Sequence, residues 1–327
     1  MLWSLLVFGA ALITVNAKLP TPRTPPQVIF QSSVSLENIA VRASSDLLLT
    51  SFTSPILFTF NPKSTNGTLA PVHTFSNATT LTGITEYRPG VFAVLSSGLS
   101  ATTSTMNLGS VFLWSVDFNA RAPAVSVLGA LPGSSGANGI TTVPGHPNIL
   151  LVADSFVGAI WQLDIATGAA RLAIQDPALS AGAPPPAVGV NGIHVRDGYL
   201  YFTTSQTAVF GRVAFHVEGG NVSAAGAVQT LASLGDGQQP DDFVFDCERR
   251  AWVTVHPGEL AVLEAPGHGS AGGWTQVAAV GNAAGSDADL VAPTSAKFGR
   301  GSEVEDKTLY VTTGAGQIVK IDSSEYN

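Results

Sequence analysis

One short pattern recurs six times along this chain, at intervals of about 45 to 56 residues. In each copy a small polar or acidic residue is followed by an apolar strand, a turn and a second apolar strand. Repeats of this length indicate an architecture in which each copy forms one four-stranded antiparallel sheet. Six such sheets around an axis make an all-β, six-bladed β-propeller, which is the fold class predicted here. The six copies open at Glu37, Thr82, Asn138, Asn191, Asp241 and Thr294.

The two ends of the repeat region complement each other. Residues 27–31 read as a strand with no partner before it, whereas the last copy, from Pro293, supplies only three strands. We therefore predict that Val28–Phe30 forms the outer strand of the last blade, because this closure removes exposed sheet edges. Blades cannot bury both faces alone, so residues 27–327 are expected to form a single domain.

The segment before the propeller is typical of a secretory leader. Residues 1–17 are apolar and end in Val15-Asn16-Ala17, which predicts a cleavable signal peptide. Residues 18–26 are rich in proline and are interpreted as a linker. Sequons at Asn66, Asn77 and Asn221 predict glycosylation, so a secreted or secretory-lumen protein is expected. Cys247 is the only cysteine, and we expect it to be a small buried hydrophobic residue.

Composition limits the partners. The net charge is −8 and the sequence has no basic cluster, which argues against nucleic acid and anionic lipid. After the leader, no run of 18 apolar residues follows, so no membrane span is expected in the mature chain. With 45% apolar and 12% charged residues, the chain has enough material for a large core. Small, apolar molecules are the partners that remain.

The residues that open the six copies predict a shared site. The first strand of each propeller blade lines the central channel, so a residue at its start lies at one mouth. Two carboxylates, Glu37 and Asp241, and two amides, Asn138 and Asn191, would suit a hard divalent cation such as Ca²⁺ or Mg²⁺. No phosphate-cradling loop or dinucleotide fingerprint is present, so no organic cofactor is expected. The alternative is that these are ordinary turn residues that bond their own backbone.

Second strands run back to the same mouth and should end beside this site. Candidate substrate-binding groups are therefore Asp154, Ser155 and Thr204 at such strand ends, with Thr82 and Thr294 from the opening column. His256 ends the second strand of the fifth copy and is a candidate proton donor or ligand-orienting group. His194 lies three residues into a first strand, where we expect a core histidine with its hydrogen bonds satisfied.

Several of these residues resemble the SMP-30/gluconolactonase family of propellers. The resemblance rests on Leu36-Glu37-Asn38, on two Asn-Gly-Ile units, and above all on residues 240–246 followed by Ala251-Trp252-Val253. It implies a divalent metal held by Glu37, Asn138, Asn191 and Asp241, with Asp241 also the general base of lactone hydrolysis. Two departures would reshape the pocket floor. Asn38-Ile39 follows Glu37 instead of Gly-Pro, and Asp242 stands in the place of the usual glycine.

Other phrases are similar to secreted fungal members of the superfamily, notably residues 37–42, 190–194 and 293–300. Some of those proteins are pericyclases. The likeness implies an intermolecular hetero-Diels–Alder reaction between a tropolone-derived o-quinone methide and a humulene-type sesquiterpene, which is the leading functional hypothesis at this stage. It is a fold-level analogy. The alternatives are a metal-dependent lactonase and a non-catalytic binding propeller.

The two chemistries make different demands. Lactone hydrolysis needs an activated water, a polarised carbonyl and a base, which Asp241 and a metal would supply. A cycloaddition needs no nucleophile, but it needs two apolar partners held face to face. Donors near the oxygen that gains charge, such as His256 and the strand-end hydroxyls, would assist it.

Overall fold

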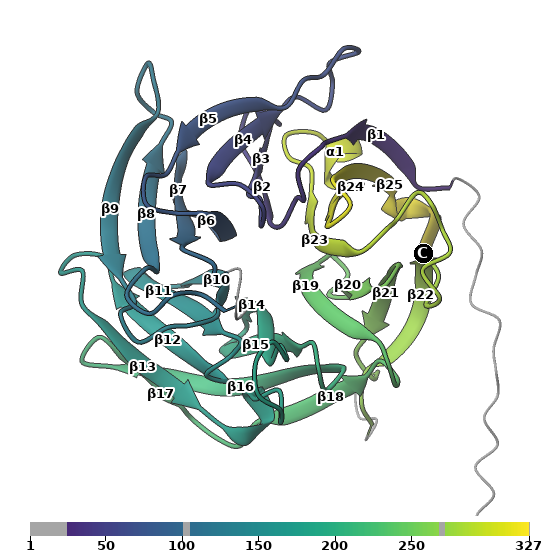
Figure 1. The fold of residues 1–327 in the computed structure, drawn as a ribbon. Helices are drawn as coiled ribbons and strands as arrows, with labels where there is room; N and C mark the ends of the chain where they lie inside the picture. The colour runs from purple at the N-terminus through teal and green to yellow at the C-terminus, as the bar shows by residue number, and fades with distance from the viewer. Residues whose placement is uncertain (1–24, 101–104, 268–271, 327) are drawn as a thin grey trace, which may run out of the picture.

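The computed structural model describes residues 25–100, 105–267 and 272–326. The chain forms six antiparallel sheets arranged radially around a central axis (Figure 1). The prediction of an all-β, six-bladed propeller is thereby confirmed. The expected signal peptide, residues 1–17, and most of the expected linker lie outside the described residues.

The strands of each blade are given below from the innermost to the outermost. Blade 1 consists of β2 (Ile39–Val41), β3 (Leu47–Leu49), β4 (Ile56–Phe60) and β5 (Ala70–Thr74). Blade 2 consists of β6 (Thr80–Arg88), β7 (Val91–Ser97), β8 (Phe112–Asp117) and β9 (Ala124–Ala130). Blade 3 consists of β10 (Ala137–Val143), β11 (His146–Asp154), β12 (Ala159–Asp164) and β13 (Ala170–Gln175). Blade 4 consists of β14 (Val190–Arg196), β15 (Tyr199–Thr204), β16 (Val209–Glu218) and β18 (Gln229–Ser233). Blade 5 consists of β19 (Gln239–Phe245), β20 (Ala251–His256), β21 (Glu259–Glu264) and β22 (Thr275–Gly281).

The sixth blade joins the two ends of the chain. Its strands are β23 (Pro293–Phe298), β24 (Thr308–Thr313), β25 (Gln317–Asp322) and, outermost, β1 (Gln27–Gln31). β1 pairs antiparallel with β25, with Val28 opposite Val319. The N-terminal strand therefore completes the last blade, as the sequence predicts, and the propeller is closed by backbone hydrogen bonds between distant parts of the chain.

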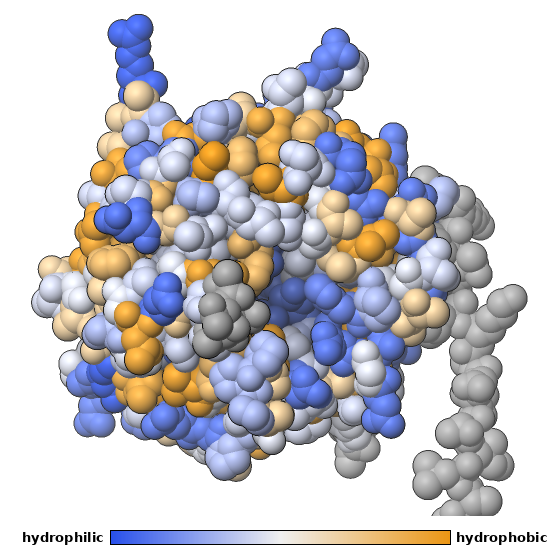
Figure 2. Space-filling view, in the orientation of Figure 1, coloured by the Kyte–Doolittle hydropathy of each residue, from blue (hydrophilic) through white to orange (hydrophobic). Residues whose placement is uncertain are grey.

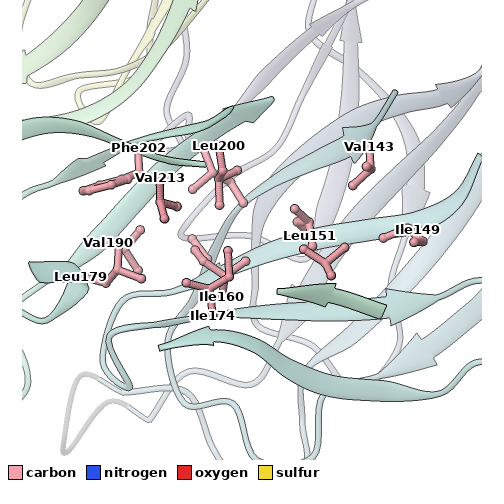
Figure 3. Close-up of a cluster of buried hydrophobic side chains, with 13 residues drawn as sticks. Val143, Ile149, Leu151, Ile160, Ile174, Leu179, Val190, Leu200, Phe202 and Val213 are labelled. Carbon is pink, nitrogen blue, oxygen red and sulfur yellow. The ribbon is translucent and has the colours of Figure 1, made fainter. Parts of the chain in front are cut away.

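The core lies between neighbouring blades. In β7 and β24 every residue is buried, because each of these second strands is covered on both faces. This explains why second strands read as continuous apolar runs in the sequence, whereas outer strands such as β9 are partly exposed. Figure 3 shows one such interface, where Leu151 and Ile160 of blade 3 gather with Leu200 and Phe202 of blade 4.

Two local features differ from expectation. Blade 4 has an additional hairpin, in which β16 continues to Glu218 and pairs with β17 (Asn221–Ala224). Cys247 is exposed rather than buried, because it lies in the turn between β19 and β20.

Within the described residues helix is confined to α1 (Glu303–Asp306) and two 3-10 turns, Pro177–Leu179 and Ser323–Tyr326. None of these helices has the length and apolarity needed to cross a membrane. The sequon residues Asn66, Asn77 and Asn221 are all exposed.

Four buried threonines, in or directly after second strands, each tie one blade to the next. Each hydroxyl donates to the backbone carbonyl of the residue that opens the following blade. The pairs are Thr50 with Thr82 (2.6 Å), Thr203 with Asp241, Thr254 with Thr294 (2.9 Å) and Thr312 with Glu37 (2.8 Å). Three of these threonine oxygens also accept a backbone N–H of their own inner strand, from Asn38, Gly192 and Asp242. We call these four side chains the threonine bridges.

Glycine also lets neighbouring blades approach closely, at Gly139 of an Asn-Gly unit and at Gly83 after Thr82. A Cβ on Gly139 would lie 2.5 Å from the Asn191 carbonyl oxygen, and one on Gly83 would lie 2.4 Å from that of Asn138. Any side chain there would therefore push neighbouring blades apart. These glycines lie within inner strands and permit close approach of two backbones.

We expect Thr312→Val to destabilise the ring where blade 6 meets blade 1. The substitution keeps the shape but leaves the buried Glu37 carbonyl without its donor, at a cost of about 1–3 kcal/mol. Urea unfolding would measure this loss. Thr230→Val, at an exposed position of β18, is the matched control. Equal stability of the two variants would contradict a structural role for the threonine bridges.

Candidate functional site

A cavity of about 260 Å³ lies at one mouth of the central channel. Figure 2 shows the polar hollow in the middle of this face of the ring. The cavity draws residues from blades that are far apart in sequence. Its lining comprises Ser35, Glu37, Phe52, Asn138, Val188, Asn191, Ser205, Gln239, Asp241, His256, Thr294 and Gly314.

Irregular strand pairing presents the opening residues to this cavity. In blades 3, 4 and 5 the register between first and second strands shifts at Ala137/Ile140, Val190/Ile193 and Pro240/Phe243. These shifts bracket Asn138, Asn191 and Asp241. A bulge of this kind re-aims a side chain that a regular strand would direct along the sheet face. The same irregularity occurs in blades 2 and 6.

Hydrogen bonds fix the orientation of both asparagine amides. Ser155 Oγ donates to the Val190 carbonyl (2.7 Å) and Ser205 Oγ donates to the Pro240 carbonyl (2.7 Å). Each serine oxygen is then left as an acceptor. Asn191 Nδ2 donates to Ser205 Oγ at 3.0 Å, and Asn138 Nδ2 lies 3.5 Å from Ser155 Oγ. The amide nitrogens therefore face the serines, which leaves the amide oxygens free for another partner.

Three buried oxygens in this cavity have no hydrogen-bond partner among the described residues. They are Oδ1 of Asn138, Oδ1 of Asn191 and Oδ1 of Asp241. Leaving a buried acceptor without a partner is costly, and three in one cavity indicate that something else bonds them. All three are oxygen ligands of the type that hard divalent cations prefer.

The carboxylates of the cavity lie close enough to disturb each other. Burial raises the pKa of Glu37 well above its usual range, and the charges of Asp241 and Asp242 raise it further. Burial also raises the pKa of Asp241, although its hydrogen bond with His256 opposes this shift. Two buried acids with little compensating charge form a site that a bound cation would relieve.

His256 lies at the edge of the cavity and contacts the second oxygen of Asp241. Its Nε2 is 3.2 Å from Asp241 Oδ2, and about a third of its side chain is exposed. Burial alone would lower the pKa of His256, but the hydrogen bond and charge of Asp241 raise it overall. Asp241 thus has one oxygen paired with an imidazole and the other unpartnered in the cavity.

Asp242 lies beneath the cavity and belongs to a separate, satisfied cluster. Its carboxylate accepts hydrogen bonds from His194 Nε2 (3.0 Å) and Ser295 Oγ (2.7 Å). Burial would raise its pKa, but His194, Lys297 and Ser295 outweigh this and bring the pKa to about 2. His194 also packs edge-on against Phe243, with ring centroids 4.7 Å apart. His194 is therefore a core histidine with a partner, as expected from the sequence.

The structure does not bring all of the candidate substrate-binding residues to the cavity. Asp154 is fully buried, and its two oxygens accept from the Trp161 indole (3.1 Å) and the Val157 backbone (3.1 Å). Thr82 donates to the Ala137 carbonyl (3.0 Å) and Thr204 bonds Thr207, so both hydroxyls stabilise local structure. Thr294 borders the cavity, but its hydroxyl donates to the Leu36 carbonyl (3.1 Å).

In blade 4 the hydroxyl that lines the cavity belongs to Ser205 and not to the predicted Thr204. The residue equivalent to Ser155 is Ser205, one place beyond Thr204, because both serines donate to the carbonyl just before an opening residue of the next blade. Aligning Asp154-Ser155 with Thr204-Ser205 would have found it. Phe52, Val188 and Gln239 also line the cavity, and no pattern in the sequence singles them out.

The residues present fit a divalent cation of the hard type. Over the residues the structure describes, no group of three or more His, Cys, Asp or Glu side chains is placed to hold a metal. A cation here would therefore rely on amide oxygens as well as carboxylates. Glu37, Asn138, Asn191 and Asp241 supply that mixture, and three of them carry the unpartnered oxygens.

Comparison with known proteins shows the fold. No family model and no curated protein matches the sequence. Among solved structures, a provisionally named gluconolactonase aligns with a TM-score of 0.62 and 16% identity over 93% of each chain. A luciferin-regenerating enzyme aligns with a TM-score of 0.59 and 13% identity, over 90% of this chain and 94% of the other.

A third structure extends the comparison. Virginiamycin B lyase from Staphylococcus aureus, solved with quinupristin, aligns with a TM-score of 0.55 and 13% identity, over 90% of this chain and 97% of the other. All three are enzymes by name, and their chemistries differ. At these identities the similarity establishes a shared propeller and leaves the activity to the site.

We expect Ca²⁺ or Mg²⁺ to raise the melting temperature of the protein. A cation that binds only the folded state stabilises it by about 2.7 kcal/mol at 100 times its Kd. Asn191→Leu should abolish the shift, because it removes one amide oxygen, and Glu218→Gln on the exposed β16–β17 hairpin should retain it. Differential scanning fluorimetry with and without EDTA would measure both. An equal shift in both variants would place the cation elsewhere.

Removing the buried charge of Glu37 should stabilise the metal-free protein at neutral pH. Because the pKa of Glu37 is raised on folding, folding opposes its ionisation, and stability falls as pH rises from the unfolded value of 4.5 through the folded value. Glu37→Gln should therefore melt higher than the wild type at pH 7 in EDTA, and the difference should shrink towards pH 4. Thermal melts at several pH values would test this. A variant less stable than the wild type at pH 7 would contradict the assignment.

Proposed function

We propose that this protein is a divalent-metal-dependent hydrolase of lactones. The observation that carries the proposal is the set of three unpartnered, buried oxygens, on Asn138, Asn191 and Asp241, in the cavity that Glu37 also lines. The fold similarity to a provisionally named gluconolactonase agrees with this choice but does not decide it.

Glu37, Asn138, Asn191 and Asp241 would hold the cation. When bound, it would polarise the carbonyl of a cyclic ester and lower the pKa of a bound water. The side chains at the edge of the cavity would carry out the proton transfers. The serines behind the two amides keep the amide oxygens directed into the cavity, so the ligand set does not have to rearrange on binding.

Asp241 and His256 are suited to moving a proton. In hydrolysis, the water oxygen forms a bond to the carbonyl carbon while its proton passes to the Asp241–His256 pair. The ring C–O bond then breaks, and the same proton goes to the departing alkoxide oxygen. The product is a hydroxy acid, and the pair returns to its starting protonation state.

The size and lining of the cavity favour one small substrate. At about 260 Å³ the cavity lies just under the usual range of about 300–1,000 Å³ for ligand sites. Phe52 and Val188 contribute apolar surface to it, whereas Glu37, Asn138, Asn191 and Asp241 supply polar groups. A lactone with a short carbon skeleton would place its ester beside the polar groups and its carbons against Phe52 and Val188.

The hetero-Diels–Alder hypothesis receives less support from the site. It requires two apolar partners stacked face to face, and the cavity offers the volume of one small ligand and a floor of carboxylates and amides. It remains a prediction. Incubation of the protein with a quinone-methide precursor and a humulene-type terpene would test it, since product yield and stereochemistry equal to those in buffer would eliminate it.

Lactone hydrolysis is tested with a panel of five- and six-membered lactones, including aldonolactones and dihydrocoumarin, by following acid release with a pH indicator. We expect activity that is lost in EDTA and restored by a divalent cation. Asp241→Asn should lower kcat by about 10²–10⁴-fold, the usual contribution of a general base. His256→Gln should lower it less and shift the pH profile.

Two controls separate loss of chemistry from loss of structure. Glu218→Gln should keep full activity, and the melting temperature of Asp241→Asn should show that the variant folds. Cation binding without hydrolysis of any lactone in the panel would overturn the proposal and favour a binding propeller.

A further inference from the structure

A second cavity, of about 450 Å³, lies on the opposite face of the ring and takes no part in the proposed hydrolysis. Inner strands begin at the mouth that holds the candidate site and run towards the other face. Arg196 and Phe245, the last residues of β14 and β19, both line the second cavity, which therefore opens between blades 4 and 5 on that far face.

One wall of this cavity is aromatic. Tyr201, Phe245 and Trp274 line it, and their ring centroids lie 5.0 to 6.3 Å apart in edge-to-face or tilted arrangements. Such a wall offers both faces and edges of rings to a planar apolar molecule. Trp274 is only partly buried, so part of its surface is available to a ligand.

Arg196 provides an unused donor beside this wall. Its guanidinium carbon lies 4.9 Å from the centroid of Phe245, and its Nε is 3.6 Å from Asp197 Oδ2. Its Nη1 is buried and has no hydrogen-bond partner among the described residues. A guanidinium presents several N–H groups in a planar fork that matches a carboxylate. A buried donor without a partner therefore indicates an acceptor that is absent here.

The other two arginines of the cavity, Arg212 and Arg249, already have partners. Arg212 donates to Gln229 Oε1 (2.8 Å) and lies over the ring of Tyr199. Arg249 forms an ion pair with Asp197, and Glu248 pairs with Arg250 at 3.3 Å. Arg196 is thus the arginine of this cavity that has a buried N–H group without a hydrogen-bond partner among the described residues. The nearby acids Asp197, Glu248 and Glu264 disfavour a small anion that brings charge without an apolar body.

We propose that this cavity is a binding site for a planar aromatic carboxylate. The carboxylate would bond Arg196, and the ring would pack against Tyr201, Phe245 and Trp274. The volume lies within the usual range for small-molecule sites. The proposal rests on these contacts alone and is independent of the lactone hydrolysis proposed for the other mouth.

Titration with 2-naphthoate, followed by isothermal calorimetry and by NMR, tests this proposal with the intact protein. We expect saturable binding of one molecule per chain. Arg196→Gln should weaken it about tenfold or more, because a hydrogen bond to a charged group contributes about 1.5–3 kcal/mol. Trp274→Leu should weaken it as well. Cyclohexanecarboxylate, which lacks a flat ring, should bind less tightly, and inorganic phosphate should not compete.

Two further variants serve as controls for the loss of binding in Arg196→Gln. Arg88 also lies over a tyrosine ring, at 5.4 Å, and ends the inner strand of blade 2 on the same face, so Arg88→Gln should bind 2-naphthoate like the wild type. Asp241→Asn should also bind normally, which separates this site from the channel mouth. Unchanged affinity in Arg196→Gln, competition by phosphate, or no binding of 2-naphthoate would overturn the proposal.

Discussion

The threonine bridges are the interaction on which the candidate site depends. Each bridge joins a second strand of one blade to the backbone carbonyl that opens the next, and the bridge from Thr312 to Glu37 spans the closure of the ring. The opening residues carry the candidate ligand side chains, so the bonds that hold the blades together also fix the positions of these side chains. Where a blade lacks a bridge, as in blades 2 and 3, glycine lets the backbones approach closely.

Charge is distributed unevenly along the channel. Glu37 and Asp241 meet at the mouth with raised pKa values, whereas Asp242, just below, has a lowered pKa because His194, Ser295 and Lys297 surround it. Asp242 is therefore compensated by three neighbours and Asp241 only by His256, whereas Glu37 has no ion pair among the described residues. This difference identifies the mouth as the place where an external cation would be stabilising.

Fold and function are separate questions for this architecture. Solved propellers with the same arrangement include enzymes with unrelated names and chemistries at 13 to 16% identity to this chain. What favours lactone hydrolysis over cycloaddition here is one small cavity, which holds three buried, unpartnered oxygens and an Asp–His pair. The larger cavity between blades 4 and 5 has a different lining, with aromatic rings and arginines.

The sequence alone determined the number of blades, the closure by residues 27–31 and the column of opening residues, because the repeat has a fixed period and each copy shows the same strand pattern. It also singled out Glu37, Asn138, Asn191, Asp241 and His256, which the structure brings to one cavity. Only the tertiary structure decided which hydroxyls face that cavity. Asp154 and Thr204 look like rim residues in the sequence, but Trp161 and Thr207 occupy their hydrogen-bonding groups. The direction of a strand-end side chain depends on bulges and on partners in the next blade, and neither can be read from a single strand.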